Sequence, residues 1–74
     1  MNKKIEEYNR VPVKVAAEYL GTSPQFIRIG LQQGRLPIGS AVQITNKKWT
    51  YYISPGLLKR FKNGGVHNFE NANN

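Results

Sequence analysis

The chain has no cysteine, no long apolar run and few acidic residues. Without cysteine it can form neither a disulfide framework nor a thiolate metal site. No apolar stretch approaches the roughly 20 residues that a membrane-spanning helix needs, and the first residues lack the apolar segment of a signal peptide. We therefore expect a cytoplasmic protein that has no membrane partner.

The scarcity of acidic and imidazole groups also argues against catalysis. The four carboxylates belong to Glu6, Glu7, Glu18 and Glu70, and no two of them form a pair that a fold of 74 residues could enclose. The single histidine, His67, lies in a stretch that we expect to be disordered. Neither a phosphate-binding glycine loop nor a nucleophile beside a base is present. We expect no enzyme, no metal site and no cofactor.

Positive charge is what the sequence has in excess. Eleven Lys and Arg residues against four acidic residues give a formal net charge of +7. Such an excess on a small chain is typical of a protein that binds a polyanion, whether DNA, RNA or an acidic membrane surface. A basic surface that is only solvated has the same composition. The positions of the charges must therefore distinguish a polyanion-binding surface from a solvated one.

Residues 13–20 predict a first helix. Four small or apolar residues recur there at the spacing of one helical face: Val13, Ala16, Ala17 and Leu20. Gly21 follows directly, as expected for a residue that ends a helix in the left-handed conformation. The two alanines leave room for a second helix to cross closely.

A second helix is predicted from Pro24 to about Gln33. Ser23 is a favourable N-cap and proline is favourable in the first turn, while Ile27 and Leu31 share the inner face and Gly34 ends the helix. Two short helices joined by a glycine-containing turn are the signature of a helix-turn-helix.

The rest of the chain predicts a hairpin and a third helix. Residues 41–44 and 49–53 are β-type runs around the polar turn 46–48, and a helix with Leu57, Leu58 and Phe61 inward is expected from Pro55 to about residue 62. The expected fold is α+β, a small winged helix-turn-helix. We expect a flexible arm over residues 1–10, the DNA-binding domain over 11–63 and a disordered tail over 64–74.

This order of elements resembles a known group of proteins. The stretch from Val13 to Arg28, VKVAAEYLGTSPQFIR, is similar to the opening of excisionase-type and MerR-like helix-turn-helix domains. The Gly-Arg-Leu-Pro run at 34–37 and the Trp-Thr-Tyr-Tyr-Ile-Ser-Pro run at 49–55 resemble the continuation in small proteins of phages and integrative elements. The resemblance covers roughly residues 11–62.

The resemblance implies double-stranded DNA binding through the second helix and the wing, which is the predicted hairpin around the turn 46–48. Many members bend DNA so that a site-specific integrase can excise an element, and others regulate transcription. The favoured role is therefore an excisionase that acts beside an integrase, with cooperative self-association on DNA as a further expectation. A transcriptional regulator of the same fold and a protein-interaction module remain alternatives. The chain departs from the usual pattern in having a single arginine, Arg28, in the second helix, and Gly30 in place of a bulky apolar residue.

Candidate DNA contacts follow from the helical spacing. Gln25, Arg28 and Gln32 fall on one face of the second helix, roughly opposite the inner face. Arginine can pair with guanine and glutamine with adenine in the major groove. Thr22 and Ser23 stand at the start of this helix, where hydroxyls and backbone amides can hold phosphate. An ordinary solvated helix face is the alternative for the glutamines.

Other candidates lie outside the second helix. Lys47 and Lys48 are predicted to contact phosphate or the minor groove from the wing tip, and Arg35 and Lys14 are candidates for the DNA backbone. Lysines also keep an exposed hairpin tip soluble. The basic residues of the third helix fit either DNA contact or complementation of the helix dipole.

The apolar and aromatic side chains of the second helix and the hairpin can each either pack against the fold or contact a nucleic acid. Phe26 and Ile29 are expected to pack, with contact to a thymine methyl as the alternative. Of Trp49, Tyr51 and Tyr52, strand alternation is expected to bury some against the helices as core area, with stacking on single strands as the alternative.

Overall fold

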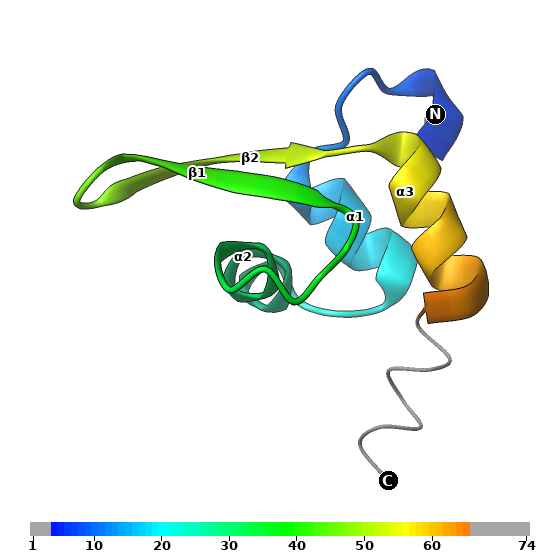
Figure 1. Cartoon of the computed structure of the whole chain (residues 1–74). Coiled ribbons are helices and arrows are strands. Elements are labelled where there is room, and N and C mark those ends of the chain that lie inside the picture. Colours follow the sequence, from blue (N-terminus) through cyan, green and yellow to red (C-terminus); the bar gives the residue numbers. More distant parts are fainter. Residues whose placement is uncertain (1–3, 66–74) are drawn as a thin grey trace, which may run out of the picture.

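The computed structural model describes residues 4–65 and contains helices and one antiparallel hairpin (Figure 1). Its elements are the 3-10 helix η1 (Ile5–Glu7), α1 (Val13–Leu20), α2 (Pro24–Gln32), β1 (Gly39–Thr45), β2 (Lys48–Ile53), α3 (Pro55–Arg60) and the π-helical turn η2 (Phe61–Gly65). The predicted small α+β fold is confirmed, and its order of elements is compatible with a winged helix-turn-helix. Within residues 4–65, no helix has the length and apolar character needed to cross a bilayer.

The ends of α1 and α2 are fixed by the residues that the sequence indicated. Gly21 adopts a φ of 73° and its amide bonds back to the carbonyls of Ala17 and Glu18, which closes α1. The Ser23 Oγ accepts a 3.1 Å hydrogen bond from the amide of Phe26 and so caps α2. Gly34, with a φ of 69°, reverses the chain after α2. The helices are therefore joined by a short turn over residues 21–23.

The core lies where the helices meet one side of the hairpin. α1 packs against α2, and α2 packs against β1. The residues that form this core are Ile5, Val11, Ala16, Ala17, Ile27, Leu31, Leu36, Ile38, Ile53 and Leu58. No polar side chain in the described residues is buried with them, so the side chains of the core are all apolar.

Leu57 departs from the inward orientation that we expected. Leu58 is fully buried and Phe61 packs against the core, but Leu57 is 40% exposed. On a helix as short as α3, the inner face admits one row of side chains at i and i+3. Leu58 and Phe61 fill that row, and Leu57 is rotated away from it.

Two glycines allow close approaches. A Cβ at Gly30 would stand 3.1 Å from the side chain of Leu36, so the absence of a side chain makes room for that buried leucine. This explains the small residue in α2 that departs from the usual pattern. At Gly39, a Cβ would collide with the carbonyl oxygen of Tyr52 on the paired strand.

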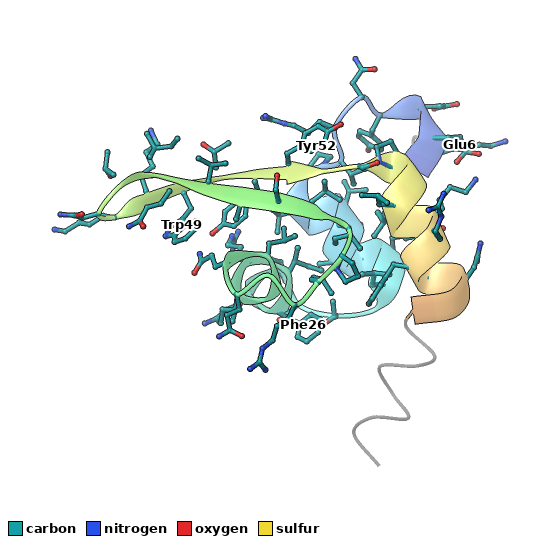
Figure 2. The ribbon with its side chains drawn as sticks, viewed as in Figure 1. Glu6, Phe26, Trp49 and Tyr52 are labelled. Atoms are coloured by element: carbon teal, nitrogen blue, oxygen red, sulfur yellow. The ribbon has the colours of Figure 1, made fainter. Side chains whose placement is uncertain are left out.

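The hairpin has an inner face toward the helices and an outer face toward solvent. Gln43 pairs with Trp49, Ala41 with Tyr51 and Gly39 with Ile53 along the inner face. Trp49 and Tyr52 accordingly lie on opposite sides of the sheet (Figure 2). Val42 and Tyr52 of the outer face are exposed, and so is Ile44, which stands at the irregularity in the register between Gln43 and Thr45. Alternation was expected to bury some of the three aromatic residues of β2: Tyr51 packs against the core, Trp49 is half-buried outside it and Tyr52 is exposed.

The N-terminal segment packs on the domain over its described part. Ile5 is buried in the core, a contact that the expectation of a flexible arm did not include, because a lone isoleucine in a polar stretch gives no periodic signal. Glu6 forms a 3.4 Å ion pair with Lys59 of α3. A hydrogen bond from its own backbone amide and the charge of Lys59 lower the pKa of Glu6. Of the expected tail, residues 64 and 65 belong to η2, and residues 66–74 lie outside the described residues.

Candidate nucleic-acid interface

α2 presents a polar face away from the core. Ile27 and Leu31 bury the opposite side of the helix, which leaves Gln25, Arg28 and Gln32 exposed. The structure thus brings these predicted residues together on one helix. Because the buried pair fixes the rotation of α2 about its axis, these three residues lie on the side of the helix that faces solvent.

A hydrogen bond joins this helix to the hairpin. The Nε2 of Gln32 donates to the hydroxyl of Tyr51 over 2.6 Å. Tyr51 belongs to the inner face of β2 and packs against the core. Gln32, a candidate for base contact, is therefore already hydrogen-bonded to the hairpin. This bond couples the position of the hairpin to that of α2.

The start of α2 offers less to a phosphate than the sequence suggested. The Ser23 Oγ already accepts from the amide of Phe26, although its hydroxyl proton can still be donated. The backbone amide of Thr22 donates to the carbonyl of Ala17 over 2.9 Å, and its side chain is half-buried. The hydroxyl of Ser23 is the better placed donor at this position.

The hairpin tip carries two exposed lysines beyond the helices. Lys47 lies in the turn, where its amide donates to the Oγ1 of Thr45, and Lys48 is the first residue of β2. A β-bulge between Gln43 and Thr45 interrupts the register just before the tip. The hairpin runs past α2, so that its tip lies well away from the helical body (Figure 1). Bulges of this kind bend and twist a strand, and here the bend lies at the base of the turn that bears the lysines.

The surface made by α2 and the hairpin has no negative charge. The sequence contains no acidic residue between Glu18 and Glu70. Four basic side chains between the start of α2 and the first residue of β2 are exposed and form no ion pair within residues 4–65, namely Arg28, Arg35, Lys47 and Lys48. An uncompensated charge of this kind attracts a polyanion.

Two basic residues near the third helix serve the fold. Lys59 pairs with Glu6. The Nζ of Lys62 donates to the carbonyl oxygen of Tyr19 over 2.8 Å and lies 4.5 Å from the centre of that tyrosine ring. It thereby satisfies a carbonyl in the last turn of α1, as a cation at a helix C-terminus does. Arg60 is exposed, with no ion pair in the described part of the chain.

Two further candidate DNA contacts, Lys14 and Arg35, lie outside α2. Lys14 is exposed on α1, and no hydrogen bond or ion pair in the described residues joins it to α2 or to the hairpin. Arg35 follows α2, and its amide donates to the carbonyl of Gly30 over 2.9 Å. Arg35 therefore extends the basic surface past the C-terminal end of α2.

Two more residues belong to the exposed face of α2. Ile29 was placed partly outward by the sequence, with packing favoured over contact to a thymine methyl, and it is 43% exposed. Gln33, which is exposed at the end of the helix, was not among the predicted contacts, although its spacing of eight residues from Gln25 could have identified it, since such residues lie on one side of a helix.

Comparison of the chain with models of protein families, with curated proteins and with solved structures finds no match. The described residues also hold no cluster of three or more His, Cys, Asp or Glu side chains that could bind a metal ion.

Proposed function

We propose that this protein binds double-stranded DNA, with α2 in the major groove and the hairpin tip on the adjacent backbone or minor groove. The observation that carries the proposal is the position of Arg28. This exposed arginine has no ion pair in the described residues and stands between Gln25 and Gln32 on a helix whose rotation is fixed by the core. Arginine and glutamine are side chains that pair with guanine and adenine in the major groove.

The charge distribution supports the same proposal. Lys47 and Lys48 extend the surface along the hairpin, and Arg35 extends it past α2. Lysine and arginine contacts to phosphates provide most of the sequence-independent affinity of a DNA-binding protein. In this proposal α2 makes the base contacts, and the basic residues that flank it provide much of the affinity for DNA.

The favoured role is that of an excisionase that assists a site-specific integrase of a mobile element. It rests on the resemblance of residues 11–62 to excisionase-type domains. A recognition helix with one arginine suits a factor that acts beside a larger DNA-binding partner. A phage or element transcriptional regulator would use the same helix and wing, and a neighbouring integrase gene would favour the excisionase.

Selection of bound duplexes from a random pool tests the proposal. The full chain is immobilised, duplexes are retained through several rounds at physiological salt, and the bound pool is sequenced. We expect an enriched motif a few base pairs long, and repeated half-sites if the protein binds cooperatively. A pool that stays random, together with no duplex binding in a direct titration, would contradict the proposal and favour a protein-interaction module.

A further inference from the structure

Ile29 is an apolar side chain at the centre of the exposed face of α2. It lies two residues from both Ile27 and Leu31, and residues two apart on an α-helix point about 160° away from each other. Both neighbours are buried, whereas Ile29 is 43% exposed. The side chain is therefore directed away from the core, where an amphipathic helix ordinarily carries a polar residue.

Glutamines surround this isoleucine on the helix surface. Gln25, Gln32 and Gln33 lie at i−4, i+3 and i+4 from it, and all are exposed. Gln32 donates its side-chain amide to Tyr51, while the amides of Gln25 and Gln33 form no side-chain hydrogen bond within residues 4–65. The centre of the face is thus an aliphatic group among uncharged amides, flanked by the positive charge of Arg28.

We propose that Ile29 contacts the C5 methyl group of a thymine in the major groove; this inference rests on the proposed function. Thymine is the base that offers an apolar group on that edge, and adenine offers the N6 and N7 atoms that a glutamine amide pairs with. The exposed face of α2 carries an aliphatic side chain that matches the thymine methyl group beside glutamine amides that match adenine. The site bound by this protein therefore contains at least one A·T pair opposite the middle of α2.

The chemistry of the surface favours DNA as the occupant of this apolar position. Exposed apolar residues of a helix also serve protein partners, but Ile29 stands in a stretch of chain with no carboxylate and is flanked by basic residues that form no ion pair within the described part of the chain. A β-branched side chain has few rotamers in a helix, so ordering it against a methyl group costs little conformational entropy.

Removing the methyl group from the DNA tests the proposal directly. In the selected duplex, each thymine is replaced in turn by deoxyuridine, which differs only by lacking the C5 methyl. The affinity of the full chain is measured by fluorescence anisotropy of labelled DNA. At one position we expect the affinity to fall by about fourfold, the factor that corresponds to one buried methylene-sized group.

The paired protein variant is Ile29→Ala. Alanine is a better helix former than isoleucine and the site is exposed, so the helix content by circular dichroism should be unchanged. This variant should bind the thymine and deoxyuridine duplexes equally well at the sensitive position. The control is Ile44→Ala, which removes a more exposed isoleucine from the hairpin and should keep the fourfold difference.

The outcomes separate this inference from the proposed function. Specific duplex binding that no deoxyuridine substitution weakens would overturn the role of Ile29 and leave DNA binding intact. A methyl effect that persists in Ile29→Ala would overturn it as well, since another residue would then make the contact. Absence of any duplex binding would overturn the proposed function and this inference together.

Discussion

The side-chain amide of Gln32 on α2 lies 2.6 Å from the hydroxyl of Tyr51 on β2 and donates a hydrogen bond to it. The two residues are 19 positions apart in the chain. Their bond joins the helix that presents Arg28 to the hairpin that presents Lys47, so both parts of the proposed interface are set at one relative position. A contact of this kind lowers the ordering cost of simultaneous binding to two grooves.

Breaking the bond from either side should have the same effect on DNA affinity. Tyr51→Phe removes only the hydroxyl, and we expect a small loss of folding stability of about 0.5–1.5 kcal/mol, typical of one hydrogen bond. We also expect weaker duplex binding. In a double-mutant cycle with Gln32→Ala, the second change should add little to the first, because both remove one interaction. Fully additive losses would show that Gln32 acts on the DNA independently of Tyr51.

Arg28→Ala should reduce sequence discrimination while the protein stays folded. Arg28 is exposed and forms no ion pair in the described structure, so its removal costs the fold little. A bidentate arginine–guanine contact contributes about 1–3 kcal/mol of discrimination. We expect a loss of roughly 5–150-fold on the selected duplex, and a much smaller loss on random duplex.

Arg60→Ala is the matched control for that measurement. Arg60 is an exposed arginine on α3, so its replacement removes the same charge from a different helix. Its effect should be small and equal on selected and random duplexes. Equal losses from both variants would remove Arg28 from base recognition.

Replacing Lys47 and Lys48 by alanine should weaken binding to all sequences alike. If each contacts one phosphate, the slope of log K against log salt should become less negative by about 1.8. The variant in which both are arginine retains the charge and should retain the slope. Loss at a single base position only would contradict backbone contact by the tip.

Gly39→Ala should destabilise the hairpin strongly. A Cβ at this position collides with the carbonyl oxygen of Tyr52, and backbone atoms of Ile53 also lie close to it. We expect the free energy of unfolding, measured in urea, to fall by more than about 2 kcal/mol. Gly56→Ala in α3 is the control, because its Cβ meets only the Ser54 Oγ at 3.9 Å, and it should be neutral or stabilising by about 0.4–1 kcal/mol.

The sequence predicted the elements better than it predicted the side chains at their surface. Capping residues such as Ser23 and Gly21 act locally, so the bounds of α1 and α2 follow from the chain itself. The position of Lys48 in β2 rather than in the turn depends on the bulge before the tip, which no local pattern indicates. The engagement of Gln32 by Tyr51 is likewise a tertiary contact.

The partners of the basic residues could not be predicted from the sequence either. Composition alone could not separate the cations that support the fold from those that remain available to a ligand. Lys59 and Lys62 are committed to Glu6 and to the end of α1, whereas Arg28 and Lys47 are not paired within the described residues. Burial of Ile5 was missed for a related reason, since its contacts come from residues far along the chain.

The dependence of duplex affinity on salt concentration shows whether the exposed basic residues bind the DNA backbone. The affinity of the full chain for its selected duplex is measured at several salt concentrations in the range of about 50–200 mM. If Arg35, Lys47 and Lys48 each neutralise one phosphate, the slope of log K against log salt should be near −2.7, which is about a fortyfold loss of affinity across that range. A flat response would contradict the account, because a surface that binds DNA through unpaired basic residues must release counterions when it does so.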